Sequence, residues 1–165
     1  MTFYEGRENS AYYASVRRLL ESLGPKESIL DVGSWDSPVA TWGDFRIRYT
    51  VDSRQRPSIP EVTKIVGPWP EATGLFQTPV SVVTCLQVLE HVDDVGAFAN
   101  ALFAMARECV IISVPYKWPS GTCKHHVHDP IDEAKLKWMT GKTPSERILT
   151  NGKLARMVAI YDVIT

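Results

Sequence analysis

The sequence lacks a long apolar run, a cysteine framework and an excess of either charge, and each absence excludes a class of protein. No apolar stretch approaches the roughly 18 residues that span a bilayer. The 3 cysteines are too few for a disulfide-stabilised fold, and the opening residues MTFYEGRENS have no basic-then-apolar signal. A net charge of −1 gives no electrostatic footprint for nucleic acid. We therefore expect a soluble, cytoplasmic protein that has neither nucleic acid nor a membrane as its partner.

The length of 165 residues predicts one domain, because domains usually hold about 100–200 residues. Internal repeats, linkers and low-complexity tracts are also missing. We expect a single domain over residues 1–165, made of an N-terminal helix at about 10–23, a core at about 28–114, and a loop, helix and hairpin at about 115–165.

The stretch from Ser28 to Asp52 carries the prediction of a ligand site. Its first apolar run stops at Asp31-Val32-Gly33, which is typical of a buried parallel strand that ends in a loop. In open α/β sheets, ligands bind beyond the carboxyl ends of such strands. A second apolar run ends at Asp52, roughly 20 residues after the glycine turn, where an acid can accept hydrogen bonds from both hydroxyls of an adenosine ribose.

The connection between these two strands is unusually short. About a dozen residues, rich in turn formers, separate Gly33 from the strand expected at Ile47–Val51, so the crossover helix must be short or irregular. Arg46 and Arg48 alternate with apolar residues, which indicates a strand with one face in water, as expected where the cover is missing. An arginine patch for an anionic substrate is the alternative.

The rest of the chain alternates strands and helices, which is typical of a parallel α/β sheet. We expect strands at 63–66, 80–85 and 109–114, a helix capped by Asp93, and a helix at 131–140. Asn151-Gly152 between two apolar runs predicts a two-residue hairpin. The predicted fold is therefore a doubly wound, mostly parallel α/β sheet that ends in an antiparallel hairpin.

Histidines supply the candidate general bases, because histidine alone titrates near neutral pH without perturbation. His91 follows the strand expected at 80–85, where a hydrogen-bonding role at a helix start is the alternative. Three others lie in a polar, aromatic loop after the strand expected at 109–114: His125, His126 and His128.

The same loop contains side chains that can ligate a metal. They are Cys123, His125, His126, His128 and Asp129. Their spacing matches no closed zinc signature, and loop histidines in water are commoner than metal sites, so we predict no metal.

Four segments, in this order and spacing, resemble a class I S-adenosylmethionine-dependent methyltransferase: SILDVGS, VDS, VVTCLQVLEHVDD and VIISVP. LQVLEHV is the most specific piece and is similar to small-molecule methyltransferases of types 11 and 12. The resemblance covers roughly Ser10 to Val163 and implies a Rossmann-like, seven-stranded sheet. It also implies methyl transfer from S-adenosyl-L-methionine to a small molecule, at oxygen or nitrogen, with S-adenosyl-L-homocysteine as the product.

The resemblance implies a role for each strand-end residue. Residues expected to bind the cofactor are Asp31, Gly33 and Ser34 at its methionine part, Asp52 and Ser53 at the ribose, Pro68 and Trp69 at the adenine, and Leu86 and Gln87 beside the sulfonium. Residues expected to bind the acceptor are Tyr12, Tyr13, Tyr116, Trp118 and His125, and the expected catalytic bases are His126, His128 and His91. For Trp69, a place in the core is an equal alternative.

One departure from the family pattern leaves other functions open. The family's first loop carries three glycines, whereas Trp35 and Ser37 stand at the second and third positions here, so the backbone can be approached less closely. S-adenosyl-L-methionine has no phosphate, so it does not need a glycine-rich helix start. A non-catalytic module that binds this cofactor is the alternative function. A nicotinamide-dependent enzyme is less favoured, because Gly-x-Gly-x-x-Gly is absent.

Overall fold

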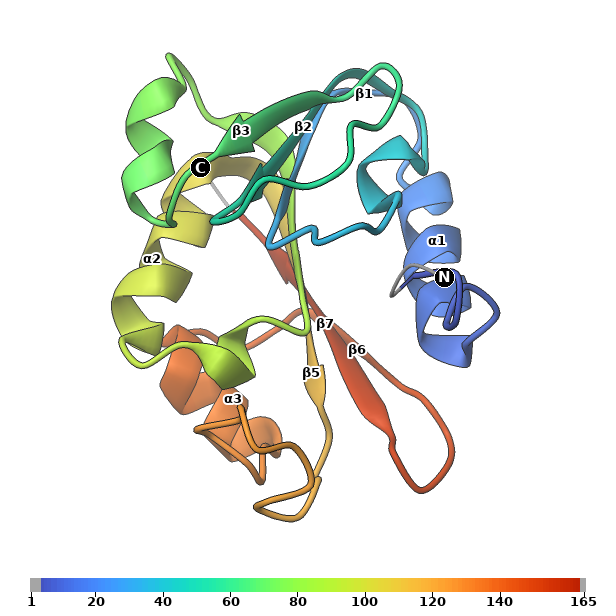
Figure 1. Ribbon diagram of the computed structural model, residues 1–165, viewed down its shortest axis with the longest axis vertical. Coiled ribbons are helices and arrows are strands. Elements are labelled where there is room, and N and C mark those ends of the chain that lie inside the picture. Colours follow the sequence, from blue (N-terminus) through green and yellow to red (C-terminus); the bar gives the residue numbers. More distant parts are fainter. Residues whose placement is uncertain (1–3, 164–165) are drawn as a thin grey trace.

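A mixed β-sheet separates two layers of helices (Figure 1). The computed structural model describes residues 4–163, and across them a 7-stranded sheet has the order β3-β2-β1-β4-β5-β7-β6. β1 to β5 are parallel, and β7 runs antiparallel between β5 and β6. This confirms the predicted doubly wound, mostly parallel sheet and its antiparallel end.

The strands and helices have the following bounds. The strands are β1 (Lys26–Val32), β2 (Phe45–Asp52), β3 (Thr63–Val66), β4 (Val80–Leu86), β5 (Ala106–Pro115), β6 (Glu146–Leu149) and β7 (Arg156–Asp162). The α-helices are α1 (Ala11–Ser22), α2 (Val95–Met105) and α3 (Glu133–Thr140), and the 3-10 helices are η1 (Val39–Thr41), η2 (Glu71–Leu75) and η3 (Leu89–His91).

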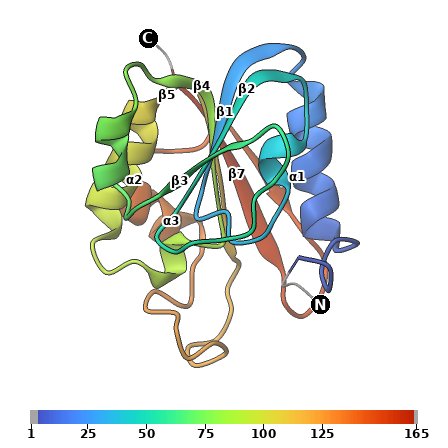
Figure 2. The same ribbon diagram turned by 45° about the horizontal axis from the view of Figure 1, so that its top comes forward.

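α1 covers one face of the sheet because its apolar side chains recur at helical spacing. Tyr12, Val16 and Leu20 are buried on it, and the Ser10 side chain caps its first turn. They share a cluster with Val39 of η1. Figures 1 and 2 show α1 and η1 on this face, with α2 and α3 on the opposite one.

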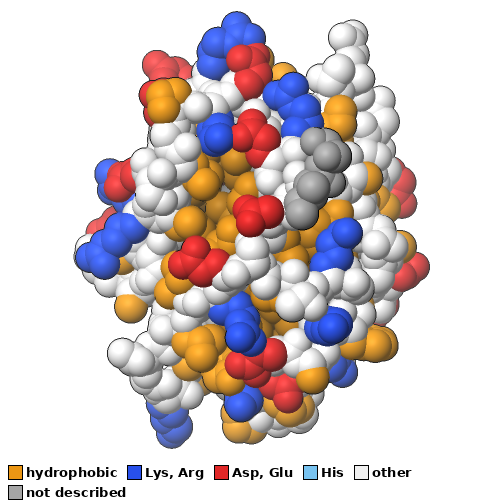
Figure 3. Space-filling view, turned by 180° about the vertical axis from the view of Figure 1, so that it is seen from behind, with side chains coloured by type: hydrophobic (Ala, Val, Ile, Leu, Met, Phe, Trp, Pro, Cys, Tyr) orange, Lys and Arg blue, Asp and Glu red, His pale blue; other side chains and the backbone are white. Residues whose placement is uncertain are grey.

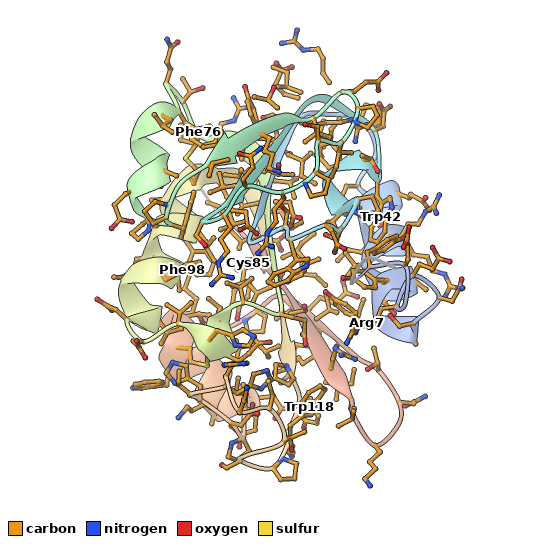
Figure 4. The ribbon with its side chains drawn as sticks, viewed as in Figure 1. Arg7, Trp42, Phe76, Cys85, Phe98 and Trp118 are labelled. Atoms are coloured by element: carbon orange, nitrogen blue, oxygen red, sulfur yellow. The ribbon has the colours of Figure 1, made fainter. Side chains whose placement is uncertain are left out.

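The α2 face contains the larger apolar cluster. Phe98 and Leu102 of α2 pack there against β4 and β5, whose central residues are apolar and buried. In Figure 4, Phe98 and Phe76 lie on this face, whereas Trp42 lies beside α1. Because both faces of β4 and β5 are covered, their polar chemistry is confined to their ends.

The short crossover after β1 is confirmed, but the expectation of an uncovered strand beside it is wrong for Arg48. Its guanidinium donates to the carbonyls of Ala40 (2.7 Å) and Gly43 (3.0 Å), so this side chain fastens the crossover to β2. Arg46 is exposed and pairs with Glu27. The two arginines are thus engaged separately.

Two local predictions need correction. α2 is capped by Asp94, which accepts from the Ala97 N–H, and not by Asp93. The hairpin is present, but its loop is longer than the two residues predicted. The backbone N–H of Thr150 donates to the carbonyl of Arg156 and thereby closes a wider loop.

Candidate functional site

The predicted site lies where β1 and β4 end side by side. From these parallel neighbours the sheet continues to β2 on one side and to β5 on the other. Ligands bind at such a switch point in open α/β sheets, because the loops diverge and leave the strand ends accessible. Asp31, Gly33, Leu86 and Gln87 are at or beyond the ends of these two strands.

Asp31 is a buried acid, and only one of its two carboxylate oxygens has a hydrogen-bond partner among residues 4–163. It is 1% exposed, and its Oδ1 accepts a 2.6 Å hydrogen bond from Thr84 Oγ1 on β4. Oδ2 has no hydrogen-bond partner among residues 4–163. Burial raises the pKa of Asp31 to about 7. An unpartnered carboxylate oxygen of this kind is costly inside a fold, and it is typical of a site that binds a donor.

The loop after β1 is held in an unusual backbone conformation. Gly33 has φ 76°, and a Cβ added there would lie 2.5 Å from a methyl of Val88, so only glycine fits. Trp35 also has positive φ, 51°, and its side chain is 47% exposed. Ser34 between them is buried. The loop therefore lies directly against the segment that follows β4.

Asp52 is already bonded within the protein. Its Oδ2 accepts from the Trp35 N–H (3.0 Å), and its Oδ1 accepts from the Arg54 N–H (2.9 Å) and from Arg56 Nε (3.3 Å). The Arg56 guanidinium lies 3.7 Å from the centre of the Trp35 ring. Ser53 is exposed beside this group. The carboxylate predicted to bind the ribose is thus already hydrogen-bonded to the Arg56 side chain and to the backbone of Trp35 and Arg54.

The predicted adenine residues lie beyond β3. Pro68 is exposed, but Trp69 is buried, and its indole N–H donates to the carbonyl of Phe98 on α2. Its packing in the core accounts for its burial, and its contact with adenine stays a prediction.

Gln87 links the ends of three strands. Its backbone N–H and its side-chain amide donate to the Ser113 carbonyl (2.9 Å) and hydroxyl (3.2 Å), and its Oε1 accepts from Arg156 Nε (3.0 Å). Leu86 packs towards the α1 cluster. Gln87 is therefore fixed in orientation beside the end of β1.

Arg156 lies among aromatic side chains predicted to bind the acceptor. Its guanidinium is 5.3 Å from the Tyr12 ring centre and 5.2 Å from that of Trp118. Tyr12 and Tyr13 are buried on α1 with ring centres 4.5 Å apart, and burial raises the pKa of Tyr13 to about 12. The structure thus brings the α1 tyrosines and Trp118 to one place, around a cation that the sequence reasoning did not include.

A second buried acid lies beside the histidines. Glu90 is 1% exposed, its Oε2 has no hydrogen-bond partner across residues 4–163, and burial raises its pKa to about 8. The rings of His91 and His126 meet edge to face at 4.7 Å, and His126 stacks on Trp118. His126 Nδ1 is 2.7 Å from Asp129 Oδ2. Burial lowers the pKa of His91.

The other predicted residues of the loop after β5 mainly anchor it. His128 Nε2 donates to the Val92 carbonyl (2.7 Å), and Tyr116 donates to Glu133 of α3 (3.0 Å). The side chain of His125 is exposed, while its carbonyl accepts from His91 Nδ1 (3.0 Å). Figures 1 and 2 show this loop extending past the ends of the strands, and Figure 4 places Trp118 in it.

Comparison with solved structures assigns the fold. The sequence matches no family model, and no curated protein matches it. A structure of magnesium protoporphyrin IX methyltransferase from Synechocystis PCC 6803 with bound S-adenosylhomocysteine is similar, with TM-score 0.66, 14% identity, and 98% of this chain and 88% of that chain covered. The chain has the class I methyltransferase fold.

Two further structures share the methyltransferase fold. N-methyltransferase NodS from Bradyrhizobium japonicum WM9, in complex with S-adenosyl-L-homocysteine, has TM-score 0.71 and 14% identity, with 92% of this chain and 85% of that chain covered. A chain from the complex of the Haloferax volcanii Trm112 methyltransferase activator with a putative methyltransferase has TM-score 0.73 and 9% identity, with 98% and 92% covered.

Within this methyltransferase fold, the sequence analysis missed Glu90, Asp129 as a histidine partner, and Arg156. The usable signal was a polar residue in an apolar setting: Glu90 follows Val88-Leu89, and Ser113 interrupts the apolar run at 109–114. Arg156 gave no such signal, because it begins a strand at the surface end of a hairpin.

Among the helices of residues 4–163, none has both the length and the apolar content to cross a membrane. On the face seen in Figure 3, basic and acidic side chains are interspersed rather than gathered by sign.

Proposed function

We propose that this protein transfers a methyl group from S-adenosyl-L-methionine to a small molecule, at an oxygen or nitrogen atom. One observation carries the proposal: at the switch point of a methyltransferase sheet, one oxygen of the buried Asp31 has no hydrogen-bond partner among residues 4–163. An ammonium group such as that of the cofactor's methionine part would satisfy this oxygen, because charge-assisted hydrogen bonds are strong in a buried setting.

The residues at the strand ends fit the cofactor unequally. Asp31, Gly33 and Ser34 offer a buried acceptor and a glycine backbone for the methionine part, and Gln87 is fixed beside them. At the ribose, Asp52 must exchange its Arg56 partner, and this contact of 3.3 Å is the longest of its hydrogen bonds. Arginine side chains are long and flexible, so we propose that Arg56 turns away when the ribose binds.

The acceptor side is formed by the loop after β5. Bound S-adenosyl-L-methionine supplies an activated sulfonium methyl group, so the protein must hold the acceptor in line and remove a proton. His126 is the best-placed group for the proton, because Asp129 fixes its Nδ1–H and leaves the Nε2 lone pair open. Tyr12, Tyr13 and Trp118 would line the space for the acceptor. We also propose the roles predicted for four further residues: His91 and His128 as bases, and His125 and Tyr116 as contacts of the acceptor.

A non-catalytic module that binds the same cofactor is the second candidate, and the Trp35–Arg56–Asp52 contacts favour it. If these contacts persist, the ribose site stays closed and turnover fails. For either function we propose one methyltransferase-like domain in the cytoplasm, because the cysteines Cys85, Cys109 and Cys123 are all free thiols.

Incubation with methyl-labelled S-adenosyl-L-methionine and fractionated cell extract tests methyl transfer. We expect label in a small-molecule fraction, and His126→Ala should lower the rate about 10²–10⁴-fold while affinity for S-adenosyl-L-homocysteine stays nearly intact. Cofactor binding without label transfer to any fraction would favour the non-catalytic module instead. A thermal shift with NAD and none with S-adenosyl-L-homocysteine would favour a nicotinamide enzyme.

A further inference from the structure

Three hydrogen bonds join the loop after β5 to the η3 segment after β4. The Val127 N–H donates to the Glu90 carbonyl (2.8 Å), His91 Nδ1 donates to the His125 carbonyl (3.0 Å), and His128 donates to the Val92 carbonyl (2.7 Å). These bonds fix the side chains of two distant segments against each other. As a result, one ligand atom each from Glu90, His91 and His126 lie within 4.8 Å of one another.

Both histidines are oriented as metal ligands usually are. A carbonyl only accepts, so His91 carries its proton on Nδ1, and the same holds for His126 Nδ1 beside the Asp129 carboxylate (2.7 Å). In its neutral form, each ring therefore has its lone pair on Nε2. Histidines that bind a metal typically donate their other N–H to a carboxylate or a backbone carbonyl in this way.

The Glu90 carboxylate is incompletely hydrogen-bonded within residues 4–163, which favours binding of a cation. Glu90 is 1% exposed, and its Oε2 has no hydrogen-bond partner among residues 4–163. Asp129 Oδ1, behind His126, likewise has none in that range. Buried carboxylate oxygens are normally paired or bound to metal, because leaving water without compensation is costly.

We propose that Glu90, His91 and His126 bind a divalent transition-metal ion such as Zn²⁺. Two imidazoles and one carboxylate suit zinc and its neighbours in the first transition row, whereas Mg²⁺ and Ca²⁺ prefer oxygen ligands alone. Ligands at about 2.0–2.1 Å from the ion lie about 3.4 Å apart in a tetrahedron, so small side-chain rotations complete the site. His91 is exposed, so the ion can enter from solvent.

Three protein ligands leave one position open, as in catalytic rather than structural zinc sites. This step rests on the proposed function: an acceptor hydroxyl bound at the open position would release its proton to solvent water more readily, and its oxygen would then take the methyl group from the sulfonium. His126 would act as a ligand instead of a base. The sequence led us to expect no metal, because only ligands within the loop after β5 were considered there. The proposed site differs because it includes Glu90.

Metal titration of the chelator-treated, desalted full chain tests the site without cofactor or acceptor. We expect one equivalent of Zn²⁺ by calorimetry, and one of Co²⁺ with visible ligand-field absorption. Glu90→Gln and His126→Ala should weaken binding at least tenfold, and Asp129→Asn, which alters only the partner of His126, by about 10–100-fold. Cys123→Ser, which removes the only thiol of the same loop, is the matched control and should bind as the wild type does.

Circular dichroism tests whether each variant is folded. If His126→Ala does not fold, Glu90→Gln still tests the site, because this substitution keeps the size of the side chain. The proposal is overturned if Glu90→Gln binds as tightly as the wild type, if Cys123→Ser alone abolishes binding, or if neither ion binds. Because only metal ions are added, a protein that binds Co²⁺ but not S-adenosyl-L-homocysteine would keep the metal site and lose the proposed function. The reverse result would do the opposite.

Discussion

The Asp31 carboxyl is the most constrained single group of the site. Burial raises its pKa to about 7, whereas the pKa of an aspartate carboxyl in an unfolded chain is about 3.9. Between these values the folded protein keeps a proton that the unfolded chain has released. The free energy of unfolding therefore falls as the pH rises through this window.

Asp31→Asn should remove that part of the pH dependence. Between about pH 5 and about pH 8, the wild type should lose roughly 2–3 kcal/mol more unfolding free energy than the variant does. Urea unfolding of both proteins at the two pH values measures this difference. The other titrating groups are the same in the two proteins, so their contributions cancel in the comparison. Parallel pH profiles would show that Asp31 does not titrate in this range.

The proposed ribose end of the site depends on Arg56, which contacts both Asp52 and Trp35. Arg56→Ala removes the side-chain donor to Asp52 Oδ1 and the cation over Trp35, so affinity for S-adenosyl-L-homocysteine should rise about two- to tenfold. Arg54→Ala is the matched control, because Arg54 contacts Asp52 through its backbone N–H, which the substitution keeps. Weaker binding by Arg56→Ala, measured by calorimetry, would mean that Arg56 contacts the ligand.

Trp35→Gly tests the departure from the family pattern. Glycine relieves the positive φ of 51° and clears the ring that Arg56 covers. If the tryptophan obstructs the ribose, S-adenosyl-L-homocysteine should bind more tightly, as with Arg56→Ala. Weaker binding in the same titration would make Trp35 part of the ligand site.

At the scale of elements, the apolar pattern predicted most of the fold. β3 agrees with its expected range, and β4 and β5 extend past theirs by only a few residues, because continuous β-branched runs favour buried strands. What the pattern missed depends on long-range contacts. The hairpin loop widens at Arg156, whose side chain reaches Gln87, and nothing near Asn151-Gly152 encodes that contact.

Only part of the candidate site could be proposed from the sequence. Asp31 and Asp52 were found because an acid at the end of an apolar strand is a local signal. The hydrogen bond from the Trp35 N–H to Asp52, and the approach of Glu90 to His126, join separate segments of the chain. Periodicity and spacing carry no information about such contacts, so only the structure reveals them.

The short crossover gives a prediction at this scale. Arg48→Met removes two hydrogen bonds from a charged donor to the carbonyls of Ala40 and Gly43, so the free energy of unfolding should fall by about 2–3 kcal/mol. Arg46→Met, on the same strand, breaks only an exposed ion pair and should leave stability almost unchanged. Equal effects of the two substitutions in denaturant unfolding would contradict the role given to Arg48.

At the scale of the whole molecule, the winding of the sheet brings both buried acids to one edge. Asp31 lies near the end of β1 and Glu90 follows β4, and the loop after β5 adds His126 beside Glu90. Two hollows lie elsewhere: one of about 240 Å³ is lined by residues of α3, and one of about 560 Å³ by residues of β2 and β3. We propose that Arg56 moves when a ligand binds at this edge, because its side chain already donates to Asp52 Oδ1.

The central claim is that this edge binds S-adenosyl-L-methionine and its product. Calorimetric titration with S-adenosyl-L-homocysteine tests it most directly, comparing the wild type with Asp52→Asn, and with Asp44→Asn at the opposite end of β2 as the control. We predict one molecule bound per chain, at least tenfold weaker binding by Asp52→Asn because each charged hydrogen bond contributes about 1.5–3 kcal/mol, and wild-type affinity for Asp44→Asn. No binding at about millimolar ligand, or equal affinity of the wild type and Asp52→Asn, would contradict the claim.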